Sequence, residues 1–353
     1  MNTIQECSTR RTSRRRSAAL LATVALISLA FAFGTLPYAS SVTQVLPNGV
    51  TFGAPGDMLG PPTGSGATQS SSHVYSPGKG GSVILELGQP IYDGVGTDLV
   101  IYENPFTRLG TLSSNWVEAF YVEVSSDGAT FARFPSEYLG PVGPHQVSPG
   151  LDDTAEYAWF RGLAGVSPVW ANPGAGVDPF HIVEGGGDAF DLEELADHAL
   201  VQSGDVVLDS INFVRLVDVA GGVDVDSNGT PIWDCGNPSF SAGDIDAVAG
   251  ISTLATLQSG YPSVDITLRP DNVIEITLED SDGLWDIKSR IALALNGVEL
   301  DFYGFLPLFN IVATPTEVTL RIGPVPAGFD PLEMKIAVRD SLGFTGGDAL
   351  HVP

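Results

Sequence analysis

The chain has 353 residues, of which 42 are acidic and 16 basic, and its formal net charge is −26. Such a negative surface repels phosphate backbones and anionic lipids, because proteins that bind them need clustered lysine and arginine. The charge therefore argues against nucleic acid and membrane surfaces as partners. Hydrophobic residues make up 43% of the chain, ample for a core, and the charged fraction of only 16% argues against disorder.

The first 41 residues have the order of a secretory signal peptide. A basic segment, Arg10–Ser17, precedes the uncharged apolar run Ala18–Phe33, and small residues follow up to Ser41. A permanent membrane anchor is the alternative, but this run is shorter than the ~20 apolar residues that span a bilayer. We expect cleavage after Ser41, a secreted protein that is extracellular or on the cell surface, and no membrane span after cleavage. The mature chain keeps 11 basic and 41 acidic residues.

Strands are expected to dominate residues 42–257. Several runs are rich in β-branched and aromatic residues, and some alternate apolar with polar as half-buried strands do. The dipeptide Asp127-Gly128 between two such runs is typical of a hairpin turn. One helix is expected over Leu192–Leu200, with Asp191 as its possible N-cap. The pattern predicts an all-β, antiparallel, jelly-roll-like β-sandwich. The expected strands are Gly81–Leu87, Asp98–Tyr102, Trp116–Val124, Thr130–Phe134 and Ile211–Val219.

Residues 258–263 have the composition of a linker, and a second all-β unit is expected over residues 264–353. It contains another hairpin dipeptide, Asn296-Gly297. Its length and its short strands fit a small immunoglobulin-like β-sandwich, although the Cys…Trp…Cys pattern of antibody domains is absent. The expected strands are Val264–Leu268, Val273–Asp280, Ser289–Leu300, Thr316–Ile322 and Glu333–Asp340.

An acidic loop over Asp224–Asp234 is the sharpest candidate metal site. Oxygen side chains at Asp224, Asp226 and Asn228, followed by a glycine, reproduce the first half of an EF-hand-type calcium loop. The second half departs from that pattern, because Asp234 comes one residue early and no helices flank the loop. A calcium loop between strands is one interpretation, and a polar Asx-turn loop is the other.

Three further acidic groups are candidate calcium ligands. Asp188 and Asp191 follow a run of glycines, and they either bind one hard cation or form a flexible turn with a helix cap. Asp244 and Asp246 would lie on one face of a strand, where like charges repel unless a cation separates them. The pair Glu103-Asn104 ends an apolar strand. The predicted cofactor is calcium, since many acids of the mature chain lack a basic partner and calcium would relieve their repulsion; high-salt surroundings are the alternative.

Several motifs in these stretches occur together in a known family. They are the segments Leu59–Pro62, Gly80–Phe106, Gly186–Leu195, Asp226–Asp234 and Gly243–Ile251. In this succession the chain resembles a family of exported bacterial cell-surface β-sandwich proteins, which typically show Phe-Glu-Asn-x-Phe, Gly-Gly-Asp-x-Phe-Asp-Leu and Asp-x-Asp-Gly-x-Pro-Ile-x-Asp motifs. The resemblance spans roughly residues 55–255.

The resemblance implies export and a β-sandwich with calcium bound, but no reaction. It places the family's acidic motifs on nine residues of this chain. Tyr102 departs from the family's phenylalanine, and the phenylalanine before Asp244 is missing. The matched residues are Glu103, Asn104, Asp188, Asp191, Asp226, Asn228, Asp234, Asp244 and Asp246.

No catalytic signature points to an enzyme. The sequence has no His-Glu-x-x-His, Gly-x-Ser-x-Gly, P-loop or dinucleotide-binding motif. Glycoside hydrolysis stays open, because it needs only two carboxylates. We therefore expect a non-enzymatic protein with no catalytic residues.

Two functions are compatible with these features. The first is a calcium-stabilised cell-surface or extracellular-matrix protein of the adhesion type, with a cell-envelope protein or glycan as its partner. The second is a carbohydrate-binding module of the galactose-binding-like type. The hairpin Val122–Phe134 is similar to one in such modules, and Trp116, Trp170 and Trp233 offer flat faces for sugars, although tryptophans are more often core residues.

Overall fold

The protein is described from a computed structural model. The predicted signal peptide lies almost entirely outside the described residues, as does most of the predicted linker. The described residues are 38–69, 71–94, 96–108, 114–143, 146–148, 151–152, 157–174, 176–177, 179, 182–234, 242–251, 262–280, 290–300, 308–314, 316–325, 332–339 and 345–352.

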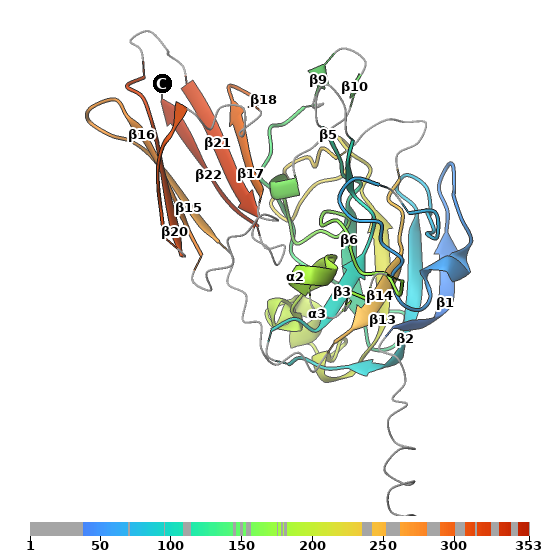
Figure 1. Ribbon diagram of the computed structural model, residues 1–353. Helices are drawn as coiled ribbons and strands as arrows, with labels where there is room; N and C mark the ends of the chain where they lie inside the picture. The colour runs from blue at the N-terminus through green and yellow to red at the C-terminus, as the bar shows by residue number, and fades with distance from the viewer. Residues whose placement is uncertain are drawn as a thin grey trace, which may run out of the picture. The chain divides into compact units, whose positions relative to one another are not determined.

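The structure is built mainly from antiparallel strands (Figure 1). The prediction of an all-β protein made of antiparallel sandwiches is therefore confirmed. The first sandwich has a five-stranded sheet of order β1-β2-β13-β6-β7 and a three-stranded sheet of order β12-β3-β14. These strands are β1 Ala39–Leu46, β2 Ser82–Ile91, β13 Ile211–Asp218, β6 Phe120–Ser125, β7 Ala132–Arg133, β12 Asp188–Phe190, β3 Leu99–Tyr102 and β14 Ala247–Gly250.

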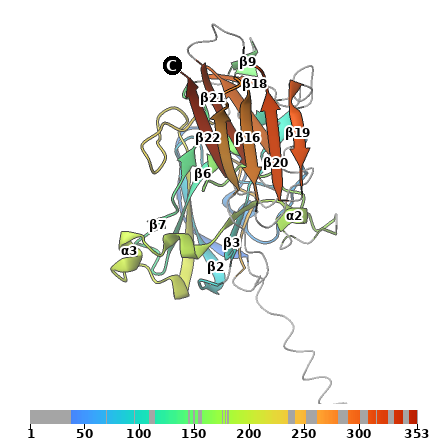
Figure 2. The same cartoon turned by 90° about the vertical axis from the view of Figure 1, so that its left-hand side faces the viewer.

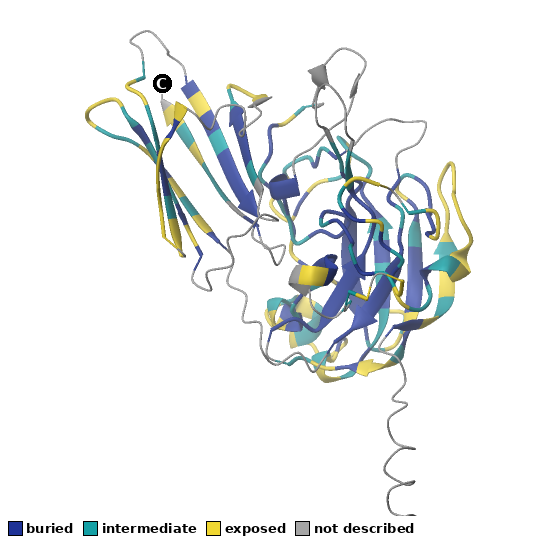
Figure 3. Ribbon diagram, in the orientation of Figure 1, coloured by how far each residue is buried: buried dark blue, intermediate teal, exposed yellow. Residues whose placement is uncertain are grey.

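The core of this sandwich lies between its two sheets. Leu85, Val122 and Val214 from the larger sheet and Ile101 and Val248 from the smaller one belong to one cluster, and all five are fully buried. Figure 3 shows these strands in the colour of buried residues. Burying each such side chain stabilises the fold by roughly 1.5–3 kcal/mol. The apolar runs in the sequence thus become strands because both sheets bury them.

Strand β1 begins inside the segment expected to be the signal peptide. Tyr38 and Ala39 are only 5% and 3% exposed, and Ala39 pairs with Leu87 of β2. Removing residues up to Ser41 would delete the start of this strand. Cleavage before Tyr38 would leave β1 whole.

Two expected elements are broken in the structure. The helix expected over Leu192–Leu200 is instead the 3-10 helix η3, Leu192–Leu195, and the α-helix α3, Ala199–Gln202. His198 separates them, because its backbone is extended and its Nδ1 accepts the Leu200 N–H at 3.2 Å. Asp191 caps η3 as expected, accepting the Glu193 N–H at 3.0 Å.

The strand expected over Trp116–Val124 is interrupted at Glu118. It is divided into β5, Ser114–Trp116, and β6. After the break the Ala119 N–H donates to Asp234 Oδ2 at 3.3 Å, and the Phe120 N–H donates to a loop carbonyl. The residues between β5 and β6 thus bond to partners outside the five-stranded sheet, and β6 begins only at Phe120. The hairpin expected at Asp127-Gly128 is confirmed, since β6 and β7 pair on either side of it.

The second set of strands forms two four-stranded sheets, of order β15-β16-β20-β19 and β18-β17-β21-β22. Figure 2 shows β16, β20 and β19 side by side. Asn296 and Gly297 have positive φ angles of 48° and 76° between β17 and β18, which confirms the second hairpin. The strands are β15 Ser263–Leu268, β16 Ile274–Glu279, β17 Arg290–Leu295, β18 Val298–Leu300, β19 Asn310–Ala313, β20 Glu317–Ile322, β21 Leu332–Arg339 and β22 Thr345–Val352.

Short elements complete the fold. In the part of the chain that the structure describes, no helix is long and apolar enough to cross a membrane. The remaining elements are η1 Pro55–Met58, β4 Phe106–Arg108, β8 Glu137–Tyr138, β9 Gln146–Ser148, β10 Leu151–Asp152, η2 Tyr157–Trp159, β11 Phe160–Arg161, α2 Ile182–Gly185 and η4 Leu208–Ser210.

Candidate cation sites

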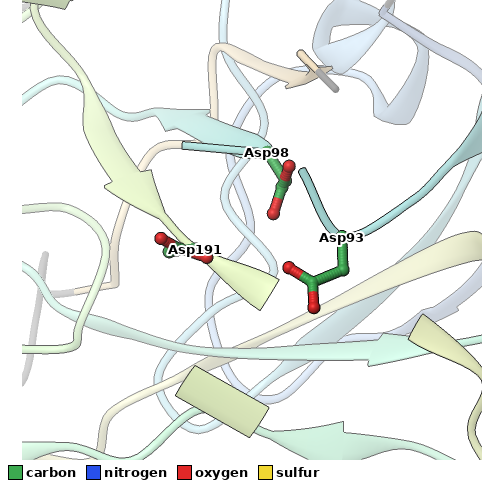
Figure 4. A group of neighbouring side chains, drawn as sticks. All are labelled: Asp93, Asp98 and Asp191. Carbon is green, nitrogen blue, oxygen red and sulfur yellow. The ribbon is translucent and has the colours of Figure 1, made fainter. Parts of the chain in front are cut away.

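Three carboxylates meet where β2 ends, β3 begins and β12 ends (Figure 4). Asp93, Asp98 and Asp191 each offer one oxygen, and these oxygens lie within 4.8 Å of one another. Calcium binds oxygen at about 2.3–2.6 Å, so two ligands on opposite sides of one ion are about 5 Å apart. The three oxygens of this triad are therefore close enough to bind one calcium ion together.

The pairing of β12 with β3 brings two of the three acids together. The strands run antiparallel, and the Asp98 N–H donates to the carbonyl of Phe190 at 3.0 Å. Asp191 is the next residue after Phe190, so it lies beside Asp98. Asp93 joins them because the loop after β2 turns back, with the Gly94 N–H donating to Asp98 Oδ1 at 2.9 Å.

The surroundings of the triad disfavour its ionised form. Burial raises the pKa of Asp98 to about 6. Burial also raises the pKa of Asp93, and the negative charges of Glu193 and Asp209 raise it further. The pKa of Asp191 is raised by burial and by the charge of Asp93. Asp93 Oδ1 is shielded from solvent and has no hydrogen-bond partner. A cation at this position would supply that partner and offset the repulsion.

The structure places Asp188 away from this triad, although the two glycine-rich-turn acids were expected to share one ion. Asp188 is 2% exposed, and its Oδ1 bonds to Arg339 Nη2 at 2.5 Å. It also accepts the N–H groups of Val166 and Ser167. Arg339 thus supplies the positive charge that a buried carboxylate requires. Of the two expected ligands Asp188 and Asp191, only Asp191 lies in the triad with Asp93 and Asp98.

The acidic loop over Asp224–Asp234 folds around the Asp226 carboxylate. Both oxygens of Asp226 accept backbone N–H bonds, and Asp224 caps the start of the loop by accepting the Ala220 N–H at 2.8 Å. Asn228 is exposed, and Asp234 turns away to the Ala119 N–H. Hydrogen bonds from an Asp side chain to nearby backbone N–H groups are typical of an Asx turn, the second of the two interpretations. Calcium binding by this loop stays a prediction. The N–H donors to Asp226 are those of Tyr138, Asn228 and Thr230.

Asp244 and Asp246 do not share the face of a strand, because β14 begins only at Ala247. Asp246 accepts the N–H of Thr63 at 2.8 Å and its hydroxyl at 3.0 Å. The Asp244 N–H instead donates to Glu103 Oε1 at 2.7 Å. Asp244 therefore belongs with Glu103, as part of a second group of acids inside the sandwich.

Three acids of these groups escaped the sequence reasoning. Asp93 and Asp98 flank the β2–β3 loop, and Glu118 interrupts a run expected to be one strand. A pair of acids at the two ends of a short loop between apolar strands was the available signal for Asp93 and Asp98. Glu118 carried a different signal, because it is a charged residue inside an apolar run.

No family model matches the chain, and no curated protein is similar to it. The resemblance to exported bacterial cell-surface proteins therefore depends on the sequence motifs alone.

Proposed function

We propose that this chain is an exported, non-enzymatic, calcium-stabilised protein of the cell-surface or extracellular-matrix type that works by adhesion. The observation that carries the proposal is the triad of Asp93, Asp98 and Asp191, whose oxygens have the spacing of ligands on one calcium ion. An ion there would tie the β2–β3 loop to the end of β12. Calcium outside the cell would thus stabilise the sandwich that binds a partner.

Calcium fits the triad better than a transition metal does. All three ligands are carboxylates, and hard oxygen donors favour calcium or magnesium over ions that prefer imidazole or thiolate. Magnesium demands near-ideal octahedral geometry at about 2.0–2.1 Å, whereas calcium accepts the less regular spacing of a loop. The negative charges of Glu193 and Asp209 nearby add attraction for a divalent cation.

Adhesion to a cell-envelope protein or glycan is the role that this proposal gives to the sandwiches. The carbohydrate-binding alternative needs an indole face open to a sugar, yet Trp116 stacks on Phe106 with ring centroids 6.4 Å apart and an interplanar angle of 18°. Trp116, Trp170 and Trp233 are half-buried, so only part of each ring is open to a sugar. A glycan array separates the two, because the alternative requires specific binding to a defined sugar.

Substitution of Asp93 tests the calcium site directly. Asp93→Asn removes one charge and keeps the size of the side chain, so we expect the variant to bind one calcium ion fewer per chain in isothermal titration calorimetry. Asp197→Asn is the matched control, because Asp197 is an exposed aspartate outside the triad. Equal calcium binding by Asp93→Asn and the wild type would overturn the proposal.

A further inference from the structure

A second group of polar residues lies at the opposite end of β3 from the triad. Glu103 and Asn104 directly follow β3, whereas Asp98 directly precedes it. Asp244 reaches Glu103 through the bond from its N–H to Glu103 Oε1 at 2.7 Å. Glu118 comes from the segment between β5 and β6. Three separate segments of the chain thus contribute to this group.

The group is buried and unsatisfied. Glu103, Asn104 and Glu118 are 2%, 4% and 6% exposed. Glu103 Oε2, Glu118 Oε1 and both amide atoms of Asn104 are shielded from solvent without any hydrogen-bond partner. Leaving such groups unpaired in the interior is costly, because they lose their hydrogen bonds to water without replacement. Unpaired polar atoms at three neighbouring side chains indicate that a ligand belongs among them.

The carboxylates of this group lie close enough to repel one another when ionised. Burial raises the pKa of Glu118 well above its usual range, and the charges of Glu103 and Asp244 raise it further. Burial and the charge of Asp244 likewise raise the pKa of Glu103. A divalent cation would satisfy these oxygens and balance their charge together.

We propose that Glu103, Asn104, Glu118 and Asp244 bind a second calcium ion in the interior of the first sandwich. Three carboxylates and one amide oxygen are hard ligands, and water or backbone carbonyls complete the six to eight that calcium takes. In the part of the chain described, these carboxylates do not meet the 4.8 Å spacing of the triad. Calcium binding therefore draws them together or uses a bridging water. The site uses no residue of the triad; it rests on the proposed calcium dependence and adds Glu118 to the ligands expected from the sequence.

The first experiment measures calcium binding and stability of Glu118→Gln, which removes the charge and keeps the shape. We expect this variant to bind one calcium ion fewer per chain in titration calorimetry. In EDTA its melting temperature should equal or exceed that of the wild type, because a buried charge is gone, while in calcium it should fall below. Glu333→Gln, on the exposed face of β21, is the control. Unchanged calcium stoichiometry in Glu118→Gln overturns the proposal.

A second readout uses terbium, which replaces calcium and emits when a nearby tryptophan is excited. The Trp116 side chain hydrogen-bonds to Glu118, so terbium at this site lies close to its indole ring. We expect Trp116→Phe to lose most of the emission excited through tryptophan, and Asp93→Asn to keep it. Full emission from Trp116→Phe would overturn the site even if Glu118→Gln failed to fold. If Asp93→Asn lost one calcium ion and Glu118→Gln lost none, the triad would be supported and the second calcium site would be refuted.

Discussion

Raising the pH is expected to destabilise the metal-free protein. The size of the expected loss of stability can be worked out from Asp218. Asp218 is 1% exposed, and burial raises its pKa to about 7, although the Gly80 and Gly243 N–H groups bond to it. In the unfolded chain the same group titrates at about 3.8. The native state therefore holds a proton that the unfolded state has lost between these two values, and stability falls as the pH rises through them.

The expected size of this effect between pH 5 and pH 7 is about 2 kcal/mol, since each pH unit contributes about 1.4 kcal/mol while the native carboxyl is fully protonated and less as it becomes half ionised near pH 7. Glu103, Glu118 and Asp234 act in the same direction, because burial raises the pKa of each. The assay is urea unfolding in EDTA at pH 5, 6, 7 and 8, followed by tryptophan fluorescence. A metal-free protein as stable at pH 8 as at pH 5 would refute the reasoning.

Three substitutions test other contacts of the structure by urea unfolding. Arg339→Met leaves the Asp188 carboxylate buried without its cation, so we expect a loss of about 3–5 kcal/mol, partly recovered by adding Asp188→Asn. A loss below about 1 kcal/mol, the usual worth of an exposed ion pair, would contradict the buried pair. Asp226→Ala removes the acceptor of three N–H groups, and we expect it to lower the free energy of unfolding equally in EDTA and in calcium. A loss of stability seen only in calcium would favour the calcium loop instead. Gly187→Ala should cost more than about 1 kcal/mol, because its φ is +89° and the new methyl would lie 2.8 Å from the Tyr102 ring; wild-type stability would contradict this.

The strands and hairpins were predictable because their signals are local. Alternating apolar residues in Ile211–Val219 and the dipeptides Asp127-Gly128 and Asn296-Gly297 specify a strand or a turn by themselves. The helix over Leu192–Leu200 was wrong as one element, because the extended backbone of His198 divides it. Strand β1 was missed, since its small residues resemble the end of a signal peptide.

The candidate sites were only partly predictable because they depend on which strands pair. Asp191 and Asp98 are far apart in the sequence, and only the pairing of β12 with β3 brings them together. Glu103 and Asp244 were both suspected, but no sequence pattern linked them to each other or to Glu118. Asp188 carried the same acidic signal as Asp191, yet a partner from β21, Arg339, neutralises it.

Thermal unfolding of the purified protein in EDTA, in calcium and in magnesium at matched ionic strength tests the central claim most directly. A ligand at 100 times its dissociation constant adds about 2.7 kcal/mol per site, which raises the melting temperature by several degrees. We predict a calcium-specific rise at pH 8, where the buried carboxylates most need a cation. Identical melting curves in EDTA and in calcium would contradict the account.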